Sequence, residues 1–286
     1  MVREIIGMNQ KGGFIMSGSE TIKADLHVHS NISDGEHDIE QLIEIAKDEG
    51  LDAIGITDHD TMSHLALIPA HAGLRTIAGV EISSIHEDTN TKAHILGYGI
   101  QNTEMITALT GPLLEARNAN SEKQAGILIK NGFDIDIEKL ARADGKYLYK
   151  QHILDWLVLT GQTPDMFGSF YRKTFKNGGI CDFDIEYINV FEAVRTVKKA
   201  GGLAVLAHPG QQRNYHLIPE LVKTGLDGLE LNHHTHTEKD REVIAGLAGQ
   251  YGLFLTGGSD FHGKYSSAPC SIGDYLSAES GIRAIL

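Results

Sequence analysis

Cysteine is scarce in this sequence of 286 residues. Its two cysteines, Cys181 and Cys270, lie far apart and form no CxxC pair. This spacing argues against a disulfide framework or a cysteine metal site and favours a reducing, cytoplasmic setting. Long apolar runs are also missing, because no stretch approaches the roughly 18 residues that a membrane-spanning helix needs. The first residues carry no secretion signal. We therefore expect a cytoplasmic protein without membrane contacts.

Positive charge is scarce as well. The chain has 25 Lys and Arg against 38 Asp and Glu, so its formal net charge is −13. A broad basic surface for duplex DNA is therefore not expected. A small anionic substrate remains compatible with this balance, because bound cations can reverse the local sign. Histidine is abundant by contrast, with 15 copies, several of them beside carboxylates at the ends of apolar segments. This pattern favours metal binding.

The order of apolar patterns predicts an α/β fold. Strands are expected at 22–26, 53–57, 76–80, 93–99, 203–207, 228–231 and 253–256, with helices after Asp38, at about 186–199 and at 243–251. Asp38 and Gln41 resemble a helix N-terminal capping pair. Strands separated by helices predict a parallel sheet or barrel. We assign residues 21–101 and 185–286 to this domain, 102–184 to a helical insertion without clear strands, and 1–20 to a weakly ordered extension.

The most specific motif is DLHVHSNISDG at residues 25–35. His27 and His29 stand two apart on an extended segment, so their side chains face the same way. Asp34 follows in a turn that can bring its carboxylate to the same cavity, and two imidazoles with a carboxylate suit a divalent cation. The alternative is a buried histidine pair that neighbouring carbonyls satisfy.

Further ligand-type residues lie within or just after other predicted strands. His59 lies between Asp58 and Asp60 in ITDHDT, where either carboxylate could orient the imidazole; a helix cap would explain the Asp residues but not the His. The other positions are Glu81 in AGVEIS, His94 in AHILGYG, His208 in LAHPG, and Asp260 with His262 in GGSDFHG. The C-terminal ends of parallel strands form the site in such folds. Each position alone is weak evidence, but nine candidate ligands together indicate a multinuclear centre.

These motifs, in this order over residues 24 to about 265, resemble the PHP (polymerase and histidinol phosphatase) superfamily, and within it the stand-alone phosphoesterases. The resemblance implies a distorted (β/α)7 PHP-type barrel with a small helical insertion domain. It also implies three divalent metal ions, Mn, Fe or Zn, at the C-terminal strand ends. One ion would take His27, His29, Glu81 and Asp260, a second Asp34, His59 and His262, and a third His94 and His208, with Glu81 bridging.

The resemblance also implies residues that contact the substrate. Arg117 matches a phosphate-contacting arginine, and a solvated helix charge is the alternative. Lys150 begins a Lys-Gln-His-Ile segment where relatives often have Arg-Pro-His-Ile, so anion binding there would differ, because lysine is a point charge rather than a bidentate fork. His236 matches a histidine near the substrate that could protonate the leaving oxygen or bind phosphate. Our candidate catalytic residues are thus His236, Arg117 and Asp58.

The resemblance thus implies a metal-dependent phosphoesterase that hydrolyses phosphate esters of nucleotides or short oligonucleotides, with a metal-bridging hydroxide attacking phosphorus. One alternative is an amidohydrolase that cleaves a C–N bond, but such barrels often have a bridging modified lysine at a strand end, and no predicted strand ends in lysine. A non-catalytic, metal-binding regulatory module is the other alternative. The full ligand set argues against it. The sequence does not indicate an oligomeric state.

Overall fold

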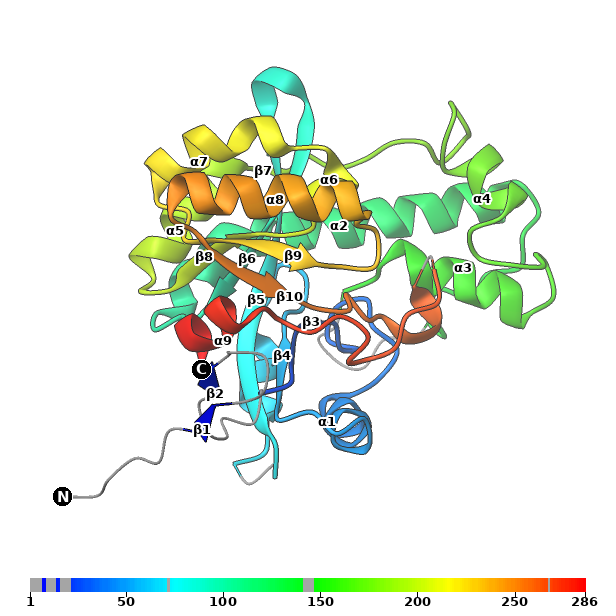
Figure 1. Ribbon diagram of the computed structural model, residues 1–286. Helices are drawn as coiled ribbons and strands as arrows, with labels where there is room; N and C mark the ends of the chain where they lie inside the picture. The colour runs from blue at the N-terminus through cyan, green and yellow to red at the C-terminus, as the bar shows by residue number, and fades with distance from the viewer. Residues whose placement is uncertain (1–6, 9–13, 16–21, 71–72, 141–146, 267) are drawn as a thin grey trace.

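A computed structural model describes residues 7–8, 14–15, 22–70, 73–140, 147–266 and 268–286. An eight-stranded sheet forms its centre. β7 (Ile188–Asn189) pairs with β5 outside the main order, which is β10 (Phe254–Gly257), β9 (Gly228–Asn232), β8 (Leu203–Leu206), β6 (Thr91–Tyr98), β5 (Arg75–His86), β4 (Ala53–Ile56) and β3 (Ala24–Val28). This sheet is curved into a nearly closed barrel with helices packed outside it (Figure 1). The predicted α/β barrel class is therefore correct. Of the expected extension, only β1 (Gly7–Met8) and β2 (Phe14–Ile15) are described, and they pair antiparallel; the rest lies outside the described residues.

The first strands follow the predicted pattern. β3 (Ala24–Val28), β4 (Ala53–Ile56) and β5 (Arg75–His86) pair in parallel. Between β3 and β4 lies α1 (Ile39–Asp48), and the predicted capping box of Asp38 and Gln41 is confirmed at its start. Its apolar residues repeat at helical spacing and are buried against the barrel, as expected for an amphipathic helix.

The middle of the sheet differs from the prediction. β5 does not end before Glu81 but continues to His86, and it turns directly into β6 (Thr91–Tyr98) through Asn90, whose φ of 50° is left-handed. Only a single 3₁₀ turn, η2 (Glu87–Thr89), separates these two strands, so they pair antiparallel, and β6 is also antiparallel to β8 (Leu203–Leu206). The expectation that Glu81 follows a strand end is therefore wrong, because Glu81 lies inside β5. His94 lies inside β6, in agreement with the strand predicted at 93–99.

The second half restores parallel pairing. β8, β9 (Gly228–Asn232) and β10 (Phe254–Gly257) are parallel neighbours. The helices of this half are α5 (Val190–Lys199), α6 (Pro209–Gln212), α7 (Ile218–Thr224), α8 (Glu238–Tyr251) and α9 (Glu279–Ile285). The short β7 (Ile188–Asn189), within the stretch expected to be helical, pairs with β5. The barrel closes after β10, where His29 N–H donates to Phe261 O at 3.0 Å and Asp260 N–H donates to His27 O at 2.8 Å.

The described part of 102–184 contains only helices as regular structure. They are α2 (Thr103–Lys130), α3 (Lys150–Leu159) and α4 (Ser169–Thr174). The far end of α2 lies with α3 and α4 beside the barrel (Figure 1). These elements share a separate apolar cluster that includes Leu128, Leu157 and Phe175. The domain boundaries themselves stay a prediction. Among all described helices, none has the length and apolar character to cross a membrane.

Candidate metal centre

β3 delivers the first two histidines into the barrel. His27 and His29 are fully buried, and their Nε2 atoms lie 3.1 Å apart, so the same-face geometry expected from the HxH spacing is present. Two buried ring nitrogens this close need a proton or a cation between them and their neighbours. The chain thus concentrates imidazoles where the strand leaves the sheet.

Glu81 and Asp260 complete a tight group with these two histidines. His27 Nε2 lies 3.3 Å from both Glu81 Oε2 and Asp260 Oδ1, and His29 Nε2 lies 3.1 Å from both. A tetrahedral cation with ligands at 2.0–2.1 Å would separate its ligand atoms by about 3.3 Å. The spacing of the four atoms therefore fits one divalent cation, and the sequence-based ligand set for the first ion meets in space.

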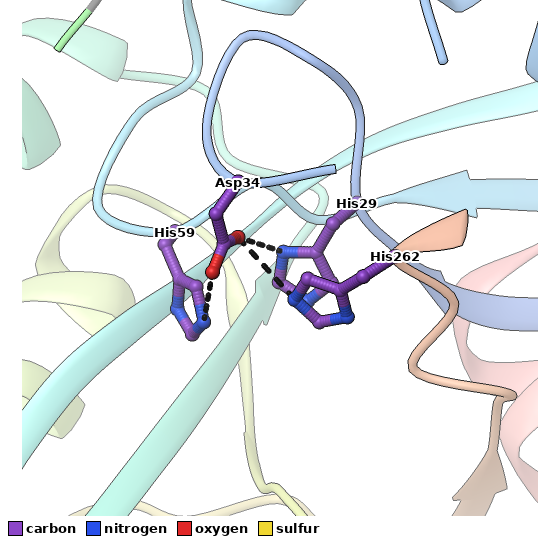
Figure 2. A group of neighbouring side chains, drawn as sticks. All are labelled: His29, Asp34, His59 and His262. Carbon is purple, nitrogen blue, oxygen red and sulfur yellow. Dashed lines mark ion pairs between the residues drawn. The ribbon is translucent and has the colours of Figure 1, made fainter. Parts of the chain in front are cut away.

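Asp34 lies at the centre of a second group (Figure 2). Its Oδ1 is 3.3 Å from His262 Nε2 and 3.8 Å from His29 Nδ1, and its Oδ2 is 4.0 Å from His59 Nε2. A Cβ on the next residue, Gly35, would lie 2.2 Å from His29 O, so the turn that presents Asp34 requires glycine. The residues proposed for the second ion thus come together, with His29 at the boundary with the first group.

Glu81 connects these groups to the third. Its Oε1 lies 2.7 Å from His94 Nδ1 and 2.9 Å from His208 Nε2, whereas its Oε2 faces His59 Nδ1 at 3.2 Å. The antiparallel pairing of β5 and β6 produces this arrangement, because Ser83, two residues from Glu81, pairs with His94. A carboxylate whose two oxygens face different imidazole groups is suited to bridge two cations.

The electrostatics also fit a cation site. Burial alone would lower the pKa of His29, but the neighbouring carboxylates of Asp260 and Glu81 outweigh it and raise the pKa to about 10. Burial lowers the pKa of His59 to about 4, although Glu81 attracts a proton to it. Buried atoms without a hydrogen-bond partner include His29 Nδ1, Asp34 Oδ1, Glu81 Oε2 and Asp260 Oδ1. Such lone pairs are costly unless a cation satisfies them, so the residues present fit metal ions.

Glu230 is a supporting residue that the sequence did not reveal. It lies fully buried in β9, and its Oε1 is 2.9 Å from His27 Nδ1. An Nδ1–H that donates to this carboxylate leaves the Nε2 lone pair of His27 directed into the centre. In the sequence, Glu230 is a single carboxylate in a predicted apolar strand, and such a position alone is a weak signal for a functional residue.

Asp58 has partners other than His59. Its carboxylate accepts hydrogen bonds from Ser30 N at 2.8 Å and from the Ser30 and Ser33 hydroxyls at 2.6 Å, and it lies 2.9 Å from His64 Nδ1. Asp58 thus fixes the turn after β3, and among the described residues its carboxylate contacts Ser30, Ser33 and His64 rather than His59. A catalytic role for Asp58 stays a prediction that these contacts do not favour.

His236 is held by the backbone. Its Nδ1–H donates to Leu231 O at 2.8 Å, and its Nε2 accepts from Gly210 N–H at 3.1 Å, so both ring nitrogens are occupied. The role of His236 as acid or phosphate ligand stays a prediction without geometric support. Two neighbours lie closer to the centre: His233 Nε2 is 3.3 Å from Asp260 Oδ2, and His234 lines a cavity with His208 and Asp260. Their place in the run NHHTH was the only available signal.

The insertion closes a polar cavity over the centre. The cavity has a volume of about 290 Å³ and combines Asp34, His59 and His94 with cationic side chains. Arg117 from α2 and Lys150 from the start of α3 line it, as do Lys92 and Lys176. Gln151 reaches from α3 to donate to Asp34 Oδ2 at 2.8 Å. The structure therefore brings both predicted cationic residues to the edge of the histidine cluster.

The comparisons with known proteins agree with this site. The PHP domain family matches residues 25–200, and the chain belongs to this family. It is 42% identical to a phosphoribosyl 1,2-cyclic phosphate 1,2-diphosphodiesterase from Eggerthella lenta, over 86% of this chain and 96% of the relative. It is 30% identical to a 3',5'-nucleoside bisphosphate phosphatase from Chromobacterium violaceum, over 83% and 86% of the two chains.

A solved structure described as a metal-dependent phosphoesterase from Bifidobacterium adolescentis has the same fold. Its TM-score is 0.84 at 27% identity, and the match covers 93% of this chain and 96% of that one. Family, relatives and buried cluster together define a metal-dependent phosphoesterase, an enzyme that hydrolyses phosphoric esters. The regulatory-module and C–N hydrolase alternatives are therefore set aside.

Proposed function

We propose that the enzyme hydrolyses a phosphate ester on a small ribose phosphate, such as a nucleotide or the end of a short oligonucleotide, and recognises a second phosphate on the same molecule. The main support is the cavity that opens onto the metal centre, in which the cationic side chains outnumber the carboxylates of Asp34 and Asp184. Lys150 lies in it partly buried, and the described residues place no carboxylate within ion-pair distance of it. In a chain of net charge −13, such a lysine is best explained by an anionic ligand.

The names of the relatives support this substrate class. A phosphoribosyl cyclic phosphate and a nucleoside 3',5'-bisphosphate are both riboses with two phosphate groups. One phosphate would lie at the histidine cluster, and the other would lie between Arg117 and Lys150. Duplex DNA does not suit a cavity of about 290 Å³ on a protein of net charge −13. A cytoplasmic location agrees with such substrates.

We propose three divalent cations, Mn, Fe or Zn, as the cofactors. The first ion would be held by His27, His29, Glu81 and Asp260, and the second by Asp34, His59 and His262. The third would be held by His94 and His208, with Glu81 shared between the first and third ions. When bound, such cations lower the pKa of water and neutralise charge on phosphate oxygens. Glu230 keeps His27 in the required tautomer, and the buried turn around Asp58 holds Asp34 in place.

The decisive experiment is a substrate panel in the presence of manganese. It contains p-nitrophenyl phosphate, AMP, adenosine 3',5'-bisphosphate, a short 5'-phosphorylated RNA and a simple amide. We expect phosphate release that a chelator abolishes, with the highest kcat/KM on the bisphosphate or the RNA. Equal kcat/KM for p-nitrophenyl phosphate and the bisphosphate would contradict the second-phosphate site. Amide cleavage without phosphate release would contradict the proposal as a whole.

A further inference from the structure

Asp60 is a buried carboxylate that the ligand groups do not use. It follows β4, is fully buried, and has a φ of 59°, in the left-handed region that asparagine and aspartate tolerate best among residues with a side chain. Its N–H donates to Glu81 O at 2.9 Å. Its Oδ1 accepts from Ser83 N–H at 2.7 Å. The backbone and the first oxygen are therefore fixed, and Oδ2 points in one direction.

That second oxygen holds Arg117. Arg117 Nη2 donates to Asp60 Oδ2 at 2.9 Å and to the Ser83 hydroxyl at 2.9 Å. The guanidinium carbon lies 5.4 Å from the centre of the Tyr149 ring. Asp60 and Ser83 thus fix one edge of the guanidinium, and the Tyr149 ring lies against one of its faces. The side chain also lines the cavity beside His59 and His94, so it remains available to a ligand there.

We propose that Asp60 is a positioning residue that sets the orientation of Arg117 for the second phosphate of the substrate. The inference rests on the proposed function, because it needs a phosphate in that cavity. Asp60 also carries a negative charge that opposes anion binding. We expect the benefit of orienting Arg117 to exceed this repulsion. Without the hydrogen bond to Asp60, the guanidinium could turn towards Asp34, whose negative charge already attracts it. An arginine must be aligned to make paired bonds to a phosphate.

The test is Asp60→Asn, which keeps the shape and the tolerance for a left-handed backbone. With adenosine 3',5'-bisphosphate we expect KM to rise about tenfold, a loss near the size of one charge-assisted hydrogen bond. With p-nitrophenyl phosphate, which has no second phosphate, kcat/KM should change less than about twofold. Asp60→Asn combined with Arg117→Ala should be no worse on the bisphosphate than Arg117→Ala alone. Asp136→Asn, at an exposed surface pair with Lys139, is the matched control and should have no effect.

Three outcomes would overturn the inference. The first is a KM for the bisphosphate that falls in Asp60→Asn. The second is an equal loss of kcat/KM on both substrates at unchanged metal content. The third is a loss of kcat/KM on the bisphosphate that adds fully to the loss caused by Arg117→Ala. If Asp60→Asn does not fold, Ser83→Ala removes one of the two acceptors of Arg117. It should raise the same KM by about threefold, and no change would contradict the proposal. Wild-type protein that acts on neither the bisphosphate nor the short 5'-phosphorylated RNA would instead refute the proposed function.

Discussion

The metal centre and the cavity under the insertion use side chains of opposite character. The centre is built from short side chains attached to strands and tight turns, such as His27, Asp34 and His208, which are almost fully enclosed. The cavity is built from long cationic side chains on helices, such as Arg117 and Lys150, which stay partly exposed. Rigid backbone therefore defines where the reaction takes place, and long side chains from the helices define what is bound.

This difference explains how substrates can vary while the chemistry stays constant. A multinuclear centre tolerates little displacement, because each ligand atom contacts several others at about 3 Å. A phosphate pocket can be rebuilt by exchanging one long side chain for another. Changes in the centre should therefore abolish catalysis on every ester, whereas changes in the insertion should separate one substrate from another.

The largest effect is expected in the centre itself. His27→Ala or Asp260→Ala removes one atom of the tight four-atom group and leaves the remaining lone pairs unsatisfied. We expect bound metal to fall and kcat to drop by more than about 100-fold on all esters, since even outer partners of metal ligands cost 10–100-fold. Elemental analysis with assays on p-nitrophenyl phosphate and the bisphosphate measures both. Full metal content with normal turnover would disprove the assignment of these ligands.

Glu230→Gln should have the next largest effect. The amide carries no charge, so its oxygen is a weaker acceptor for His27 Nδ1–H, and its NH₂ group cannot accept this hydrogen bond at all. Affinity for manganese should fall by about 10–100-fold. A metal titration of activity measures this shift, and saturating metal should restore most of kcat. Persistent loss at saturating metal would show that Glu230 acts in another way.

The sequence predicted the centre better than the cavity for a physical reason. His27 with His29, and Asp260 with His262, stand two residues apart, and an extended chain turns such pairs to one side. Glu81 was also identified, but for the wrong topological reason, because an apolar pattern does not distinguish a strand that ends from one that continues into a hairpin. His94 depends entirely on that hairpin pairing.

Long-range partners could not be read from the chain. Asp60 and Arg117 are 57 residues apart, and Glu230 is 203 residues from His27, so only the folded barrel brings them together. For His236, the sequence suggested a role that the contacts in the structure do not support. Its position in a histidine-rich run favoured a catalytic role, yet both ring nitrogens contact the backbone. Residue type and spacing identify ligands, whereas tertiary contacts decide which histidines are free to act.

A substitution in the apolar core of the insertion tests whether the insertion unfolds separately from the metal centre. Leu157 is fully buried in the cluster formed by α2, α3 and α4. Leu157→Ala should lower the free energy of unfolding by about 2–5 kcal/mol through lost burial and the cavity that remains. If 102–184 folds as its own unit, an early unfolding transition should leave the bound metal in place. Metal release in the same transition would show that insertion and barrel unfold together.

Lys150→Ala should have the smallest effect and the most selective one. Lys150 has no carboxylate partner among the described residues, so its removal leaves no buried anion unpaired. We expect KM for the bisphosphate to rise about fivefold, close to 1 kcal/mol, and to rise less at high salt because the contact is electrostatic. Lys139→Ala, on the exposed surface of the insertion, is the matched control. An equal rise in KM for p-nitrophenyl phosphate would mean that Lys150 binds the phosphate that reacts. The barrel would then not be the part that performs catalysis alone, with the insertion selecting the substrate.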